Sequence, residues 1–262
     1  AVLRDINPDA EVFPAAIEAL SRCYDLWLRE KQQHGEEITT VRQEATDFFD
    51  QVILGSQRQW PERWSPAQRI AALTTARLRN YFADDQAVDA QHVLQAALTD
   101  RGATEDPSWA EEARILLILA FAGQAGRQEE ALSMLQSFAA KTSKRSLQLI
   151  TGLSRLADQA SPALRSQLSH IQIEAVKQLQ PHLEQLDATQ RLELQQVEAE
   201  ALVQSGKLAE ALARYRGLAE QLPDNRRIQV RLAELLIENN APQTHSEAIK
   251  QWQEIAKRTR PT

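Results

Sequence analysis

Residues 206–225 constrain the fold of this chain more than any other stretch. Gly206 is typical of a helix end, and a glutamate-alanine pair follows early in the next predicted helix. The aromatic Tyr215 comes four residues after the small Ala211, and Pro223 begins the Pro-Asp-Asn sequence that closes the unit. Small residues let two helices approach closely, and large residues fill the groove beside them. A unit of this size cannot bury its apolar face alone, so similar units are expected around it.

The composition predicts an all-α fold. The chain of 262 residues is 43% hydrophobic and 25% charged, which is typical of a folded protein. Alanine, leucine, glutamine, glutamate and arginine recur throughout, and all five favour helices. Because apolar residues do not alternate with polar ones over any clear run, strands are not expected.

Capping residues and breaks in the apolar pattern predict about twelve helices. They cover roughly 12–33, 36–56, 66–83, 86–99, 107–124, 127–141, 144–158, 162–180, 188–205, 207–221, 225–239 and 245–259. Capping boxes are predicted at Ser65 to Gln68, Asp187 to Gln190 and Thr244 to Glu247. A capping residue followed by proline occurs at Asp106-Pro107 and Ser161-Pro162. Short connections predict that neighbouring helices are antiparallel.

Residues 192–225 resemble a tetratricopeptide repeat, a family of paired helices. The signature places of the second helix are filled by Gly206, Leu208, Ala211, Tyr215 and Pro223. Less regular copies cover 71–102, 112–145 and 226–261. A gap of 80 residues between Ala131 and Ala211 leaves room for one further unit, 146–186, so the spacing is nearer to about 40 than to the family's period of about 34. The resemblance implies a right-handed α-solenoid.

The predicted array covers 65–262, and residues 1–64 fit no repeat. This N-terminal segment is expected to form two long helices that either cap the array or continue it as degenerate repeats. Residues 57–65 break the helical pattern and contain Trp60 and Trp64. Two interpretations remain open here: a domain boundary, or a packed loop that both tryptophans anchor.

Charge and cysteine content exclude several classes of function. A net charge of -6 weighs against nucleic-acid binding, although a local basic groove is compatible with it. Cys23 is the only cysteine, which rules out an intramolecular disulfide, and its helical position predicts a buried small apolar residue. The longest apolar run, 115–122, is too short to span a bilayer. The compartment stays open: cytoplasmic, or periplasmic or secreted if Ala1 follows a removed signal peptide.

No residue constellation predicts catalysis, a metal or a cofactor. His170 and Glu174 have a spacing that can present two ligands, but no further pair of histidines or cysteines accompanies them, and solvated surface is the better interpretation. Trp27, Trp109 and Trp252 stand at helical positions that predict core packing.

The family resemblance implies that the first helix of each pair lines a concave groove. On those helices the candidate partner-binding residues are Arg77, Arg79, Gln196, Glu200, Arg227 and Arg231. The arginines are suited to gripping carboxylates of a partner. Some members of the family hold a C-terminal carboxylate with lysine and asparagine, but the corresponding positions here are Leu116, Ala120, Gln196 and Glu200, so that mode is not expected.

The predicted function is therefore a non-catalytic scaffold or adaptor that binds a protein or peptide along a concave helical surface. A second hypothesis is the helical accessory region of a larger enzyme or of a secretion or envelope assembly. A third is a self-associating structural module, with exposed apolar faces on first helices such as 115–121. A helical-repeat RNA binder is the weakest, because the chain is acidic.

Overall fold

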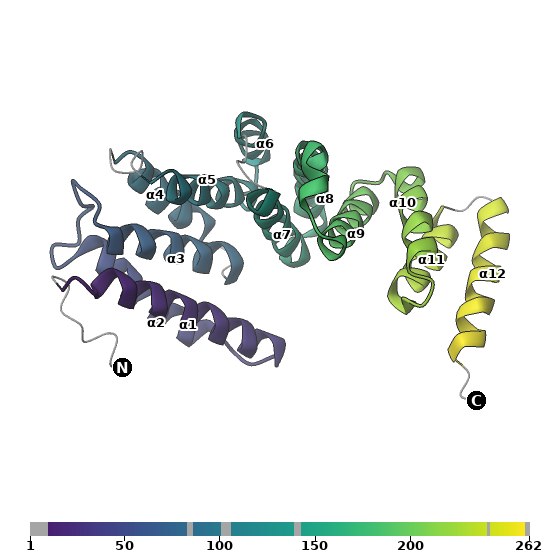
Figure 1. Cartoon of the computed structure of the whole chain (residues 1–262), viewed down its shortest axis with the longest axis horizontal. Helices are drawn as coiled ribbons and strands as arrows, with labels where there is room; N and C mark the ends of the chain where they lie inside the picture. The colour runs from purple at the N-terminus through teal and green to yellow at the C-terminus, as the bar shows by residue number, and fades with distance from the viewer. Residues whose placement is uncertain (1–9, 83–85, 101–105, 139–142, 240–241, 260–262) are drawn as a thin grey trace. The chain divides into compact units, whose positions relative to one another are not determined.

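The computed structural model describes residues 10–82, 86–100, 106–138, 143–239 and 242–259, and within these ranges the chain is helical with no strand. The α-helices follow one another along the chain (Figure 1). They are α1 (Phe13–Gln33), α2 (Thr39–Leu54), α3 (Pro66–Phe82), α4 (Ala87–Leu98), α5 (Pro107–Ala122), α6 (Gln128–Ser137), α7 (Ser143–Gln159), α8 (Pro162–Leu179), α9 (Ala188–Gln204), α10 (Leu208–Gln221), α11 (Arg226–Glu238) and α12 (Pro242–Thr259). A short 3-10 helix, η3 (Gln180–Gln185), follows α8. The predicted all-α fold is confirmed.

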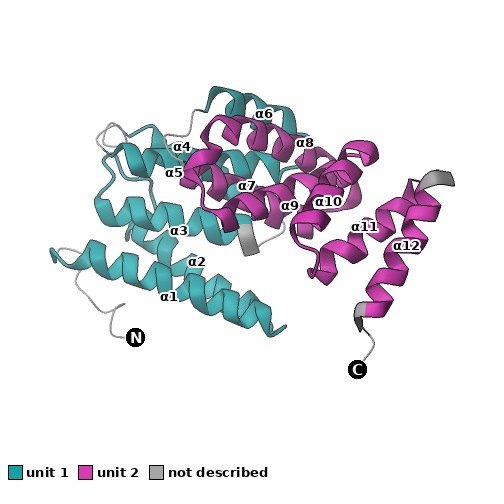
Figure 2. Ribbon diagram, turned by 45° about the vertical axis from the view of Figure 1, so that its right-hand side comes forward, with its two compact units in different colours: residues 1–140 teal, residues 141–262 magenta. Residues whose placement is uncertain are grey.

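The chain forms two compact units, residues 1–140 with α1 to α6 and residues 141–262 with α7 to α12 (Figure 2). In each unit consecutive helices pack against each other as antiparallel neighbours. In the first unit α3 also packs against α1 and α5, so alternate helices form a layer of their own. The helices on both sides of the predicted boundary at 64/65, α2 and α3, pack together within one unit. The division at that point remains a prediction.

Side chains cap four of the five described helices for which the sequence predicts a start signal. The backbone N–H of Gln68 donates to the Ser65 hydroxyl at 3.3 Å, and the Ser65 N–H donates to the Gln68 side chain at 3.0 Å. Asp187 and Gln190 form the same reciprocal box at 2.8 and 3.1 Å. These bonds satisfy N–H groups that the first turn of a helix leaves free. Asp106 caps α5 through one bond, which its carboxylate accepts from the Trp109 N–H at 3.0 Å.

The start of α12 differs from the prediction. Thr244 was expected to cap this helix, but α12 begins at Pro242 and Thr244 lies buried inside its first turn. Proline fits a first turn because it has no N–H to satisfy and its φ already suits a helix. The capping-box assignment at Thr244 and Glu247 is therefore wrong.

Several expectations about apolar residues are also wrong. Cys23, Trp27 and Trp252 were expected in the core, but all three are exposed. Tyr24 and Ile255, each three residues away on the same helix as Trp27 and Trp252 respectively, are buried instead. Amphipathic spacing identifies an apolar position but not which side the neighbouring helix covers.

Trp109 lies as its position predicts, whereas only one of the two tryptophans between α2 and α3 is buried. Trp109 is buried, as expected, and its indole N–H donates to the Arg69 carbonyl at 2.9 Å. In the connection between α2 and α3, Trp64 is buried and Trp60 stacks on it with ring centroids 6.0 Å apart while remaining exposed. Only one of the two tryptophans is therefore an anchor in the core.

The apolar run 115–121 on α5 does not form an exposed face. Every residue in it is buried, since α5 packs against α3, α4 and α6. Self-association through this particular run is excluded, because its side chains already fill the core of the first unit.

Gly206 ends α9 in the conformation that the repeat pattern requires. Its φ is +77°, in the left-handed region that side-chain-bearing residues avoid. The N–H of Lys207 donates to the Leu202 carbonyl and the N–H of Gly206 to the Val203 carbonyl, both at 2.9 Å, which is a Schellman motif. The chain thus reverses from α9 into α10 with its end carbonyls satisfied.

We expect opposite effects from alanine at two glycines of this repeat. A Cβ at either Gly206 or Gly217 meets no atom within 4 Å, so the backbone conformation alone determines how alanine changes the stability. Gly206→Ala is expected to destabilise by roughly 1 kcal/mol because φ is positive, and Gly217→Ala, inside α10, to stabilise by about as much. The urea midpoints of the two variants should move in opposite directions. A shift in the same direction would contradict this account of the turn.

Candidate functional site

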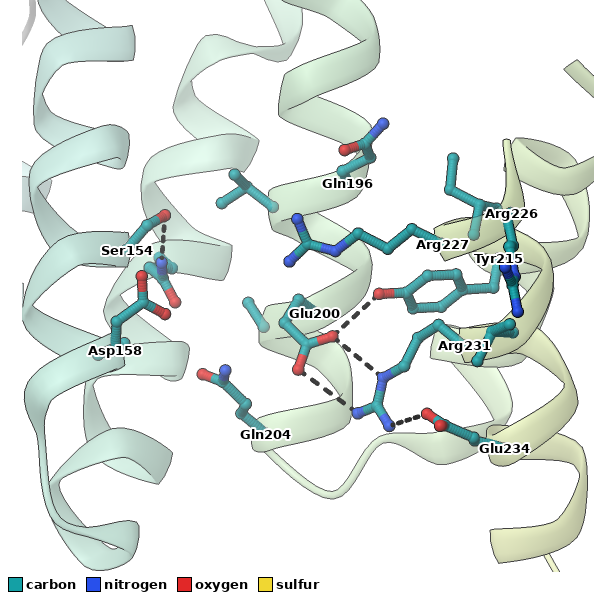
Figure 3. Close-up of a pocket in the computed structure, with 16 residues that line it drawn as sticks. Ser154, Asp158, Gln196, Glu200, Gln204, Tyr215, Arg226, Arg227, Arg231 and Glu234 are labelled. Atoms are coloured by element: carbon teal, nitrogen blue, oxygen red, sulfur yellow. Dashed lines mark hydrogen bonds and ion pairs between the residues drawn. The ribbon is translucent and has the colours of Figure 1, made fainter. Parts of the chain in front are cut away.

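The second unit contains a groove of about 860 Å³ between α7, α9 and α11 (Figure 3). Ser154 and Asp158 on α7 form one wall, and Gln196 and Glu200 on α9 lie in the middle. The opposite wall comes from α11, with one residue of α10 beside it. The wall residues on that side are Tyr215, Arg226, Arg227, Ile228, Val230, Arg231 and Glu234. Helices of successive pairs therefore converge on one polar cavity.

Glu200 is the centre of the polar network in this groove. The Tyr215 hydroxyl donates to its Oε2 at 2.9 Å, and Arg231 donates from Nε to Oε2 and from Nη2 to Oε1, each at 3.4 Å. Arg231 also reaches Glu234 at 3.4 Å and Glu238 at 3.6 Å. The network joins α9, α10 and α11, so it holds the groove floor in one arrangement (Figure 3).

The network shifts the pKa values of two of its members. Burial raises the pKa of Tyr215 well above its ordinary value of 10.0, and the adjacent Glu200 charge raises it further. Burial lowers the pKa of Arg231, but the charge and hydrogen bonds of Glu200, with Glu234 and Glu238, outweigh this effect and leave that pKa raised. Tyr215 therefore stays protonated as a donor, and Arg231 stays charged.

Above this floor, the groove presents charges without partners. In the described part of the chain, the side chains of Arg226, Arg227, Asp158 and Gln196 make no hydrogen bond or ion pair. Arg227 extends from α11 across the cavity toward the face of α9 (Figure 3). The α11 wall is therefore cationic and the α7 wall anionic, with a neutral amide between them.

The structure brings four of the six predicted partner-binding residues together. Gln196 and Glu200 on α9 and Arg227 and Arg231 on α11 all line this groove. Their function as a binding surface remains a proposal, because geometry alone places them without showing a ligand.

The other two predicted residues lie in the first unit and are paired within the chain. Arg77 forms an ion pair with Glu112 of α5, and Arg79 pairs with Asp50 of α2 at 2.7 Å. Burial raises the pKa of Asp50 more than the charge and hydrogen bond of the facing Arg79 lower it. Both arginines join α3 to its neighbours.

Sequence reasoning missed Asp158 and Gln204 as groove residues. Each lies one helical turn beyond another lining residue, Ser154 and Glu200 respectively. Extending the i, i+4 spacing along α7 and α9 would have found them. The hydroxyl of Tyr215 had no such signal, because the pattern gave only its role as a large packing residue.

Residues 202–255, from the end of α9 to most of α12, match the family model described as tetratricopeptide repeat. This segment is a tetratricopeptide repeat. The match covers the turn at Gly206 and the Tyr215 position, which carried the resemblance in the sequence. Searches of curated proteins and of solved structures found no match. The other predicted copies, at 71–102, 112–145 and 146–186, remain predictions.

Tetratricopeptide repeats are typical of protein-protein interaction scaffolds, and no catalytic family was found. In the described ranges, no group of three or more histidine, cysteine, aspartate or glutamate side chains is placed to hold a metal ion. None of the described helices is long and apolar enough to cross a membrane.

The raised pKa of Tyr215 predicts an alkaline loss of stability. The folded chain retains this proton while the unfolded chain releases it near pH 10.0, so its contribution is full below that pH and falls as pH rises through it. At neutral pH, Tyr215→Phe is expected to be about 1 kcal/mol less stable, because Glu200 loses a donor. Urea unfolding should show that the difference in unfolding free energy between the wild type and the variant becomes smaller above pH 10.0. Only the wild type has the Tyr215 proton, whose contribution to stability falls there. A constant gap would contradict the assignment.

Proposed function

We propose that the chain is a non-catalytic scaffold whose tetratricopeptide-repeat unit binds a segment of a partner protein in the groove between α7, α9 and α11. The observation that carries the proposal is that the guanidinium groups of Arg226 and Arg227, on a wall of that groove, have no partner among the described residues. Guanidinium groups bind carboxylates with two parallel hydrogen bonds, which makes an acidic residue of the partner the natural contact.

The groove floor favours this role because it is already satisfied internally. Arg231 is occupied by Glu200 and Glu234, so it does not compete for the partner's carboxylate. A floor held by Tyr215 and Glu200 loses little entropy on binding, and preorganised sites bind more tightly for that reason. Gln196 has a free amide that suits the backbone of an extended segment.

The opposite wall adds a second condition on the partner. Asp158 presents an unpaired carboxylate on α7, facing the cationic α11 wall across the cavity. A bound segment with an acidic residue toward α11 and a basic or polar residue toward α7 would match both walls. Electrostatic complementarity of this kind sets orientation and association rate more than affinity.

Selection from a displayed library of random peptides tests the proposal. We expect the full chain to enrich peptides that contain aspartate or glutamate, because Arg227 and Arg226 offer the free donors. Arg227→Glu should weaken binding of the enriched peptides at least about tenfold, since an attraction becomes a repulsion at the groove wall. Fluorescence anisotropy with labelled peptides measures the change.

Arg22→Glu on α1 is the matched control, because this arginine is exposed and lies in the other unit. It should leave peptide affinity unchanged, and circular dichroism should show both variants folded. Enriched peptides that bind the Arg227→Glu variant as tightly as the wild type would refute the groove as the binding surface.

A further inference from the structure

The last helix pair, α11 and α12, exposes three large apolar side chains. Ile237 is 51% exposed, Ile249 is 60% exposed and Trp252 is 38% exposed. Scattered apolar residues are common on surfaces, and these three alone would need no explanation. Their positions within the repeat give them significance.

Each of the three has a counterpart in the preceding pair, α9 and α10. The first helices align with an offset of 34 residues, which matches Val203 to Ile237. The second helices align with an offset of 37, which matches Leu212 to Ile249 and Tyr215 to Trp252. The counterparts belong to one apolar cluster with Ile228, Leu232 and Leu235 of α11. Leu212 is only 3% exposed and Tyr215 only 6%.

Two other matched positions of the second helices serve as an internal control. Ala211 and its counterpart Ala248 are both buried, and so are Leu218 and its counterpart Ile255. The two pairs therefore pack alike internally. They differ where α11 covers the preceding pair, because no described helix covers the corresponding face of α11 and α12.

The charge pattern continues in the same register. Across the α9–α11 junction, Glu200 binds Arg231 of the covering helix. Glu234 is the counterpart of Glu200. Trp252 is the counterpart of Tyr215, which lies beside Glu200. Glu234 is half exposed and pairs at 3.4 Å with Arg231 of its own helix. The exposed face of α11 and α12 thus repeats both the apolar and the anionic parts of the junction at which α11 covers α9 and α10.

We propose that the face formed by Ile237, Ile249 and Trp252 binds an amphipathic helix of a partner protein, in the way that α11 covers α9 and α10. The bound helix carries aliphatic residues at i, i+4 and i+7, as Ile228, Leu232 and Leu235 do in α11. It carries a basic residue at the position that matches Arg231, and this residue contacts Glu234. The three apolar residues of this face do not line the groove between α7, α9 and α11, whereas Glu234 belongs to the linings of both.

A synthetic peptide with the α11 sequence, residues 225–239, is the probe because it holds this pattern. Labelled with fluorescein, it should bind the full chain with saturable anisotropy. Trp252→Ala should weaken binding at least about tenfold, since tryptophan contacts dominate interfaces of this kind. Trp60→Ala is the matched control, because Trp60 is an exposed tryptophan of the other unit, and it should leave affinity unchanged.

A charge exchange makes the test specific for register. A peptide with Arg231→Glu should bind the wild type several-fold more weakly, and Glu234→Arg in the chain should restore its affinity. Equal binding to the wild type and to the Trp252→Ala variant, with both folded by circular dichroism, would overturn the proposal. So would sedimentation data showing that the chain dimerises through Trp252, because the occupant would then be a second copy.

Discussion

The close approach of successive helices at small residues is the constraint on which the second unit depends. Ala199, Ala211 and Ala248 are all buried, and larger residues fill the space beside them. A larger side chain at these places would separate the helices and open the core, since interiors are packed as densely as crystals. Because each pair packs on the next through the same contacts, a change at one junction affects only its neighbours.

Tyr215 couples this packing to the groove. Its ring belongs to the apolar cluster that joins α10 and α11, while its hydroxyl donates to Glu200 in the groove floor. Glu200 in turn holds Arg231, so the placement of α11 beside α9 positions the wall that carries Arg227. The polar network therefore depends on the same helix spacing as the core, and the unpartnered Arg227 of the described groove lies above it.

Much of the fold follows from local interactions that can be predicted from the sequence alone. The reciprocal caps at Ser65 and Asp187 and the left-handed glycine at Gly206 act within one turn, so reading them needs no tertiary contact. Four groove residues were found because the family resemblance assigns the first helix of each pair to the groove, and α9 and α11 are such helices. Arg77 and Arg79 show the limit of this reasoning, because their carboxylate partners come from helices about 30 residues away in sequence.

The sequence by itself determined the helices, their antiparallel pairing and the repeat at 202–255, because caps, turns and amphipathic spacing are short-range properties. Only the tertiary structure decided which apolar faces are covered. It buried the run 115–121 and left Trp27 and Trp252 exposed. It also decided which charged side chains are paired within the described part of the chain, as Arg231 is, and which have no partner there, as Arg227 has none. Both outcomes depend on which helix lies opposite, and residue spacing along one helix carries no such information.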